Sequence, residues 1–515
     1  MDTSNKAAAA ARGTLWSIGL RLLSFVCTQI TLRTVDPVAL GKANIDLELA
    51  FGFILFLSRE GFRLTLAKEW NTQLAQGTRI VHFVVAILVS LWLLLWKNGK
   101  EDNGSNYDYR LASILYCLAA VLEGWAEPLV LRALFQVELH HKIASEGMAT
   151  IAKTFVTVLA LSLLPSNFAI TAFGVAQIGY AVVYNLVLRY RIPHLVAGKD
   201  AISKSNERRL SFQVLLFTIQ GIFKHILTEG DRILLVLLLQ DNAYDKGLYA
   251  LASAYGGMAA RLLFQPLEEN ARLLWIKLSS KVENHRVQSK EKSELQESYS
   301  LLVKFVLYIG LFFAAFGTNY TDVLLRLIMS SSNQDRAVAA APVLSAFCVY
   351  TLTMALNGTT EALLYAISTS PRDLSVLTLV HFIAGVLSYS LLAPWWVQLY
   401  GTVGLVAANT VCMILRSVYA MFVSTRYFQT ASVTSVSPHP IVLLAFFTTF
   451  VATRWSRQHF FFQHGEKEIN WWVGAMKHVS VGIACLVGTV SVIVLLERNY
   501  IRALRSMIRR PTKQD

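Results

Sequence analysis

The chain has 515 residues, of which 54% are hydrophobic and only 16% are charged. Because about a quarter of the residues of a soluble domain are charged, this composition excludes an ordinary soluble protein and indicates a polytopic helical membrane protein. The formal net charge of +14 does not favour a nucleic-acid partner, because the Lys and Arg residues lie mostly between and beyond the apolar runs, where they set membrane topology.

Apolar runs of the length that a membrane-spanning helix needs, about 20 residues, recur along the whole chain. The first, near residues 12–35, lacks the features of a cleavable signal and is expected to stay as a span. The runs predict an all-α polytopic fold of about fourteen transmembrane helices. Their predicted centres are Phe25, Ile54, Leu88, Ala119, Val158, Tyr180, Gly230, Ala259, Ile309, Thr353, Ala384, Cys412, Phe446 and Ile483.

A long basic link at residues 190–210 divides these spans into groups of six, six and two. We expect an N-lobe at residues 1–205 with spans one to six and a C-lobe at residues 206–430 with spans seven to twelve. Residues 431–515 are expected to hold two additional spans and a basic cytoplasmic tail. The two six-helix lobes are expected to face each other around a central cavity.

Basic residues predict the orientation of the chain. They gather after span six, after span eight and in the C-terminal tail, which share one side of the membrane if the span count is fourteen. The positive-inside rule makes that side cytoplasmic, so both termini are expected there. The sequons at Asn103 and Asn319 then fall in loops on the opposite side and are predicted glycosylation sites. A third sequon, at Asn357, falls inside span ten and is not expected to be used.

Signals for an enzyme are poor. The five cysteines are scattered singly, without metal or redox spacing, and no P-loop or H-E-x-x-H motif is present. Asp46 and Glu48 resemble the acidic pair of membrane glycosyltransferases, but those enzymes need a long lumenal loop at this point and the chain has a short one. We therefore expect a non-enzymatic protein with no catalytic residues, cofactor or metal.

Ionisable side chains inside the apolar spans are the most informative feature of the chain. Each costs roughly 2.5–3.5 kcal/mol at the centre of a bilayer, so their number indicates that they line a polar cavity enclosed by the helices. They are Arg59, Glu60 and Arg63; Glu123 and Glu127; Lys224, His225, Glu229, Asp231 and Arg232; Arg261, Glu268, Glu269 and Arg272; and Glu361.

Arg59 and Arg63 are four residues apart and share a helix face. Two interpretations stay open: a cationic patch at the end of a cavity, or stop-transfer residues that reach to the membrane interface.

Glu123 and Glu127 also share a face, directly before Pro128, which frees a backbone carbonyl and permits a kink. Arg132 or Arg21 could supply a cation to them. A structural ion pair and a ligand contact are equally consistent with the pattern.

In the seventh span, His225, Glu229 and Arg232 fall on one helical stripe, which favours cavity lining. The stripe of Arg261, Glu268 and Arg272 in the eighth span can neutralise itself and is a weaker sign of a ligand. Glu361 in span ten has no partner that the sequence identifies.

Several of these polar strings resemble motifs of the Rft family, and the resemblance runs from span one to span twelve. Asp231 stands where the family pattern leads us to expect Glu, and the last two spans match only in hydropathy. The strings are Ser58-Arg59-Glu60-Gly61-Phe62-Arg63, Glu123-x-x-x-Glu127-Pro128, Ile226-Leu227-Thr228-Glu229-Gly230-Asp231-Arg232, Ala260-Arg261-Leu262-Leu263-Phe264-Gln265-Pro266-Leu267-Glu268-Glu269, Asn357-Gly358-Thr359-Thr360-Glu361, and Gly401-Thr402-Val403-Gly404-Leu405 with Ala408-Asn409.

The resemblance implies a multi-pass protein of the endoplasmic-reticulum membrane, in the multidrug/oligosaccharidyl-lipid/polysaccharide flippase superfamily. The implied function is flipping of a dolichyl-diphosphate-linked oligosaccharide for protein N-glycosylation by alternating access. The alternative is a non-transporting lipid-binding scaffold or chaperone that supports lumenal N-glycan assembly, and a third is an ion-coupled drug exporter. The implied partners are the dolichyl-diphosphate oligosaccharide lipid and the lipids of that membrane, with glycosyltransferases of the N-glycan pathway as further candidates.

In a flippase, cations would bind the diphosphate by charge-assisted hydrogen bonds. The candidates for this contact are Arg21, Arg59, Arg63, Lys224, Arg232 and Arg261. Acidic residues would pair with these cations, contact sugar hydroxyls or act in gating. These are Glu60, Glu123, Glu127, Glu229, Asp231, Glu268, Glu269 and Glu361.

Overall fold

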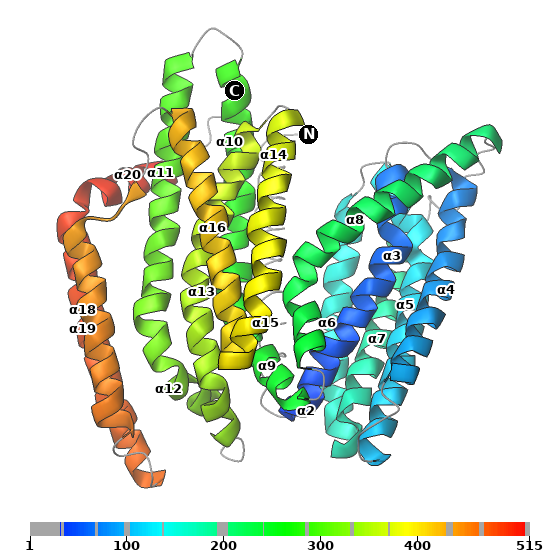
Figure 1. Ribbon diagram of the computed structural model, residues 1–515, viewed down its shortest axis with the longest axis horizontal. Helices are drawn as coiled ribbons and strands as arrows, with labels where there is room; N and C mark the ends of the chain where they lie inside the picture. Colours follow the sequence, from blue (N-terminus) through cyan, green and yellow to red (C-terminus); the bar gives the residue numbers. More distant parts are fainter. Residues whose placement is uncertain are drawn as a thin grey trace. The chain divides into compact units, whose positions relative to one another are not determined.

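The structure is a computed structural model. It describes residues 31, 35–66, 71–96, 103–135, 139–192, 204–239, 242–283, 288–329, 334–368, 371–428, 436–462 and 468–509. Within these ranges the regular structure is helical and no β-strand occurs (Figure 1). The predicted all-α fold is confirmed for this part of the chain.

Packing divides the chain into two units, residues 1–250 and 251–515. The helices of the first unit are α2 (Pro37–Gly41), η1 (Lys42–Leu47), α3 (Glu48–Leu66), α4 (Thr72–Trp96), α5 (Asn103–Phe135), α6 (Leu139–Leu163), η2 (Ser166–Phe168), α7 (Ala169–Arg191), α8 (Lys204–Leu238) and the beginning of α9 (Ala243–Ala259), up to residue 250. The second unit contains the end of α9, then η4 (Ala260–Phe264), α10 (Gln265–Glu283), α11 (Gln288–Phe312), η5 (Phe313–Gly317), α12 (Thr318–Ile328), α13 (Gln334–Ile367), α14 (Pro371–His381), η7 (Phe382–Leu387), α15 (Ser388–Tyr400), α16 (Thr402–Phe428), α18 (Pro440–Ser456), η8 (Arg457–Phe462), α19 (Glu468–Leu496) and α20 (Arg498–Arg509).

The boundary between the units falls inside α9, whereas the predicted lobes divide at residue 205. α8 packs along α3 and so belongs with the first unit. The functional division into lobes at 1–205, 206–430 and 431–515 stays a prediction.

In the first unit α5 is the central helix, because α3, α4 and α7 all pack on it. The contact face of α5 is rich in small residues, among them Ala112, Ala119 and Ala126, each 0% exposed. Small side chains let helix backbones approach closely, which is how helices associate in lipid. Further along, Val130 of α5 packs with Tyr184 and other buried residues of α7.

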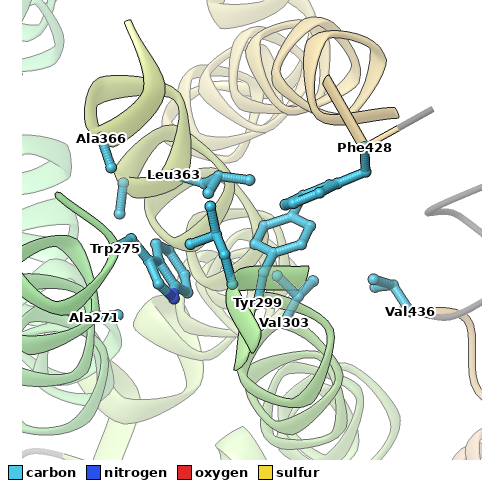
Figure 2. Close-up of a cluster of buried hydrophobic side chains, with 10 residues drawn as sticks. Ala271, Trp275, Tyr299, Val303, Leu363, Ala366, Phe428 and Val436 are labelled. Carbon is cyan, nitrogen blue, oxygen red and sulfur yellow. The ribbon is translucent and has the colours of Figure 1, made fainter. Parts of the chain in front are cut away.

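The second unit repeats this arrangement around α13, on which α10, α11, α12 and α16 pack. At one end of α13, Trp275 and Tyr299 lie in edge contact at 5.7 Å between ring centroids, and Phe428 lies 5.9 Å from Tyr299 (Figure 2). Leu363 of α13 packs into the same cluster. The Trp275 indole donates to Ser298 Oγ at 3.1 Å, so its one polar atom is satisfied although the side chain is fully buried.

Nine helical segments of the described chain are long and apolar enough to cross a membrane. Apolar side chains on their outer faces are exposed, as on α4, where Ile80 and Leu88 are 68% and 60% exposed. Such faces suit contact with lipid tails. The chain is a polytopic helical membrane protein.

Every predicted span centre except Phe25, which lies outside the described residues, falls inside a helix. Four of these helical stretches are not among the nine apolar segments. Three of them, α3, α8 and α9 with α10, carry the charged runs described above, and the fourth, α18, has only 17 residues. The number fourteen therefore stays a prediction, while the helices themselves are confirmed.

Candidate functional site

Two arginines of α3 pair with two glutamates of α5. Arg59 Nη1 lies 2.8 Å from Glu123 Oε1. Arg63 donates twice to Glu127, from Nε at 2.5 Å and from Nη2 at 2.8 Å. Because both pairs repeat at a spacing of four residues, they form two rungs between the helices, which we call the α3–α5 ladder.

The α3–α5 ladder is largely shielded from solvent. The side chains of Glu127 and Glu123 are 1% and 7% exposed, and those of Arg63 and Arg59 are 17% and 24% exposed. Charges at this depth persist only when they are paired and hydrogen-bonded. The ladder thus neutralises two positive and two negative charges that would otherwise be costly inside a membrane.

The predicted partner of the two glutamates needs correction. Both Glu123 and Glu127 are paired with cations of α3, Glu123 with Arg59 and Glu127 with Arg63. Arg21, the other candidate, lies outside the described residues. The spacing of four correctly indicated a shared face, but only the packing of α3 on α5 decides which cations that face meets. For Arg59 and Arg63 this pairing favours an inward role over stop-transfer residues at the interface.

A histidine of α4 completes the surroundings of the α3–α5 ladder. His82 is 1% exposed and packs so closely on α5 that a Cβ at Gly124 would meet its imidazole ring. Its Nδ1 lies 2.9 Å from the Thr78 carbonyl oxygen, which can only accept, so Nδ1 carries a proton. Neither His82 Nε2 nor Glu123 Oε2 has a hydrogen-bond partner among the described residues. The ladder therefore has unused hydrogen-bonding capacity on its Glu123 side.

Glu60, also on α3, is half-buried and has no ion pair with the described side chains. It lies within electrostatic reach of His225 of α8. The His225 ring stacks on Phe56 at 4.4 Å and contacts Phe53 edge-on at 4.8 Å.

The predicted stripe along α8 does not act as one group. His225 packs against aromatic residues of α3, whereas Arg232 pairs with Glu229 on its own helix at 3.1 Å. Arg232 is 42% exposed at its side chain, so this pair is weak. The side chains of Lys224 and Asp231, two further predicted site residues, lie outside the described part of the chain.

In the second unit Glu361 has partners that the sequence did not identify. Arg416 of α16 donates to it from Nε and Nη2, both at 2.8 Å, and His381 Nε2 lies 3.1 Å from Oε1. Glu361 is 8% exposed. Arg416 was the missed residue, although an arginine in the middle of an apolar run is the same kind of signal that pointed to Arg59 and Arg63.

Glu268 of α10 lies against the middle of α13. A Cβ at Gly358 would overlap its carboxylate, so α10 and α13 approach closely because this position is glycine. Arg272, on the same predicted stripe, is exposed. The side chains of Arg261 and Glu269 lie outside the described part of the chain, so the stripe is not tested there.

The central helices of the two units carry a related motif. α5 contains Glu123-Gly124-x-x-Glu127, and α13 contains Asn357-Gly358-x-x-Glu361. In each motif the last glutamate accepts two bonds from one arginine. In the first unit that arginine comes from α3 and in the second from α16, so the two units reach the same pairing from different helices.

Further ion pairs lie outside the predicted site. Lys246 pairs with Asp46 at 2.9 Å, with side chains 2% and 7% exposed, and Lys153 pairs with Glu48 at 2.5 Å. The two acids that resemble a glycosyltransferase pair are therefore each bound to a lysine. No group of three or more His, Cys, Asp or Glu residues in the described chain is arranged to hold a metal ion.

The predicted placement of the Asn319 sequon in a loop is wrong. Asn319 lies inside α12 rather than in a loop, and it is 1% exposed. Its Nδ2, the atom that a glycan would modify, donates to Thr453 Oγ1 at 2.9 Å. Asn357 is likewise buried, in α13, as expected. Asn103 is the first residue of α5, and its side chain is outside the described part of the chain.

Comparison with known proteins agrees with this architecture. The chain is 27% identical over 530 residues to the Man(5)GlcNAc(2)-PP-dolichol translocation protein RFT1 of Xenopus tropicalis, covering 96% of each chain. It is 28% identical to the protein of that name from Candida albicans, covering 80% of each, and 26% identical to that from Mus musculus, covering 98% of this chain and 97% of the other.

Two solved structures show the fold class. An inward-facing multidrug resistance MATE family transporter of the MOP superfamily matches with a TM-score of 0.56 at 11% identity, covering 82% of this chain and 96% of the other. The lipid II flippase MurJ, in an inward closed conformation, matches with a TM-score of 0.55 at 12% identity, covering 96% of this chain and 99% of the other. The model of the Rft protein family matches residues 12–507, and the chain belongs to that family.

Proposed function

We propose that this protein translocates a dolichyl-diphosphate-linked oligosaccharide across the membrane of the endoplasmic reticulum for protein N-glycosylation. Its relatives are named as translocation proteins for such a lipid, and its fold is shared with a lipid flippase. The observation that carries the proposal is the α3–α5 ladder, which largely shields two arginines from solvent and holds each one on a glutamate.

The chemistry of the cargo fits these arginines. A diphosphate-oligosaccharide headgroup is charged and rich in hydroxyls, so it does not cross about 30 Å of hydrocarbon unaided. A guanidinium binds carboxylate and phosphate through the same two-pronged geometry. A diphosphate can therefore take the place of a glutamate on Arg59 or Arg63, and the glutamate can take the cation back when the lipid leaves.

The singly bonded rung is the natural starting point for this exchange. Arg59 holds Glu123 through one bond, and Glu123 Oε2 is unpartnered, whereas Arg63 and Glu127 share two bonds. Arg21, Lys224, Arg232 and Arg261 remain candidates for further contacts with the diphosphate. Glu60, Glu229, Asp231, Glu268, Glu269 and Glu361 remain candidates for cavity lining or gating.

The remaining parts of the proposal concern setting and mechanism. Two lobes open a central cavity alternately to each side, both termini are cytoplasmic, and the polyprenyl tail stays in the lipid. The protein is not an enzyme, and translocation uses no cofactor of its own. Glycosyltransferases of the N-glycan pathway would act on the lipid after translocation.

The test is a reconstituted translocation assay. Full-length protein in vesicles of phosphatidylcholine is supplied with the dolichyl-diphosphate oligosaccharide, and a membrane-impermeant lectin reports how fast the headgroup changes sides. We expect faster exchange than in empty vesicles and a reduction of at least tenfold with Arg59→Gln. Arg79→Gln is the matched control, because Arg79 lies on an exposed face of α4, 5.5 Å from the Trp125 ring, and we expect it to leave the rate unchanged.

Exchange no faster than in empty vesicles, with the protein shown to be folded, would refute translocation. If such protein still bound the lipid, the scaffold or chaperone function would explain the similarity to the relatives instead.

A further inference from the structure

The last helix of the chain, α20, is strongly amphipathic. Arg498, Arg502, Arg505 and Arg509 occur at i, i+4, i+7 and i+11, which places all four on one face. Tyr500 and Leu504 lie on the opposite side of the helix. A short helix with an arginine face and an apolar face is typical of helices that lie in the plane of a membrane surface.

A buried glutamate fixes where α20 begins. Glu497 separates α19 from α20 and is 8% exposed. It accepts bonds from Lys304 Nζ at 2.7 Å, Tyr308 OH at 2.9 Å and the backbone N–H of His439 at 3.0 Å. Two of these donors belong to α11 and the third is the residue before α18. Glu497 therefore holds the junction between α19 and α20 against α11 and against the start of α18.

The apolar face of α20 is held against α11. The ring of Tyr500 lies 5.8 Å from that of Tyr308, and its hydroxyl donates to the Leu301 carbonyl at 3.5 Å. From the C-terminal end of α19, α20 therefore runs crosswise to α19 and towards α11 (Figure 1). It does not continue along the axis of α19.

The position of α19 locates α20 at a membrane surface. Residues Trp471–Leu496 form the most apolar of the nine candidate spans in the described chain, and only a small part of this span is buried in the protein. These 26 residues extend about 39 Å as a helix, more than the roughly 30 Å of hydrocarbon. The end of α19 thus lies at the headgroup level, and α20 starts there.

The arginine face of α20 is open. Arg498, Arg502 and Arg505 are exposed. Arg502 donates to Asn499 on its own helix at 3.0 Å, and none of the three is paired with a carboxylate of the described chain. Three cations at headgroup level that have no acidic partner in the described chain suit anionic groups outside the protein.

We propose that α20 is a docking surface for anionic glycerophospholipids of the leaflet next to the C-terminus, whose phosphate groups bind the arginine face. Phospholipids are the occupant because the face lies at headgroup level, repeats over the length of the helix and needs no pocket. The attraction amounts to about fivefold in local enrichment for each arginine near the surface. This site is separate from the ladder and does not depend on translocation.

The experiment uses full-length protein in nanodiscs of phosphatidylcholine with 20% phosphatidylserine. A donor dye is attached enzymatically at the C-terminus, and the acceptor is either headgroup-labelled phosphatidylserine or headgroup-labelled phosphatidylcholine at equal density. We expect energy transfer to the serine lipid to exceed that to the choline lipid severalfold at low salt. The excess should fall as ionic strength rises, because salt screens exposed charges.

Two sets of variants separate charge from folding. Replacing the four arginines of α20 by Gln should bring the ratio of the two transfer signals to about one, whereas replacing them by Lys should preserve the excess. Translocation of the oligosaccharide lipid should persist in both. Equal transfer to both lipids in the native protein would overturn the proposal. So would an excess that survives in the Gln variant, or one that is lost in the Lys variant while that variant elutes as a folded monodisperse protein.

Discussion

The bidentate rung Arg63–Glu127 separates a structural role of the α3–α5 ladder from a role in binding the headgroup. The informative change replaces both residues, as Arg63→Met with Glu127→Met. Methionine is flexible and apolar, so it fills the space left by both side chains without burying a charge. The single variants Glu127→Gln and Arg63→Met break the pair and leave one partner behind.

The burial of the pair sets the magnitudes. Glu127 is 1% and Arg63 17% exposed at the side chain, so removal of one partner leaves the other as a buried, uncompensated charge and should cost about 3–5 kcal/mol. In a unit of 250 residues this corresponds to a fall of roughly 6–20 °C in the unfolding midpoint. Glu123→Gln removes the negative charge from a rung with a single bond but keeps an acceptor oxygen, so it should cost less, about 1–3 kcal/mol. The double methionine variant should return close to the stability of the native protein.

Two measurements on the same purified samples are needed. Thermal unfolding, followed by intrinsic fluorescence in detergent, gives the midpoints, and the vesicle assay with the dolichyl-diphosphate oligosaccharide gives the translocation rate. We expect the double variant to be as stable as the native protein but at least tenfold slower in translocation. Arg63→Lys should keep the charge yet recover the rate only in part, because an ammonium lacks the two-pronged geometry.

A double methionine variant that is stable and translocates at the native rate would show that the rung only holds α3 on α5. The headgroup role of Arg63 would then be abandoned. A single variant Glu127→Gln with an unchanged midpoint would instead contradict the geometry of the pair.

Three further predictions concern packing and charge. Gly61→Ala should lower the unfolding midpoint markedly, because a Cβ there would overlap α8. Gly52→Ala should not lower it, because a Cβ there has no atom within 4 Å. An equal effect of the two substitutions would contradict the close approach of α3 and α8. Lys246→Met should cost about 3–5 kcal/mol by removing the ammonium that neutralises the buried Asp46 carboxylate, and adding Asp46→Leu should restore the midpoint. Burial alone would raise the pKa of Glu497, but its hydrogen bonds and a nearby ammonium hold that pKa below the ordinary value of 4.5. Its stabilisation is therefore present above about pH 4.5 and is lost as the pH falls through the lower pKa. The difference in unfolding midpoint between the native protein and Glu497→Gln should therefore narrow as the pH is lowered below about 4.5.

Membrane character and the helical nature of the spans follow from composition and run length, because a helix satisfies its own backbone hydrogen bonds in lipid whatever surrounds it. The charged interruptions also mark positions of interest from sequence alone, since each is costly at membrane depth. This logic found Arg59, Arg63, Glu123 and Glu127. Applied to Arg416, it would have marked that residue as a position of interest as well.

Sequon patterns show the opposite case. Asn319-Tyr320-Thr321 has the required residues, but whether Asn319 is accessible depends on where η5 and α12 run. Because the helix continues through this segment and packs on α18, the side-chain amide of Asn319 donates to Phe450 and Thr453 inside the protein. The three residues of a sequon do not predict how the segment packs.

The sequence by itself determined that this protein is helical, embedded in a membrane and equipped with buried charges, because these properties depend on local composition and on a spacing of four. Only the tertiary structure decided that Glu127 meets Arg63, that Glu361 meets Arg416, and that Glu497 turns α20 across the end of α19. The partners of each of these contacts lie on different helices, and the choice among helices is made by the packing of small and apolar side chains.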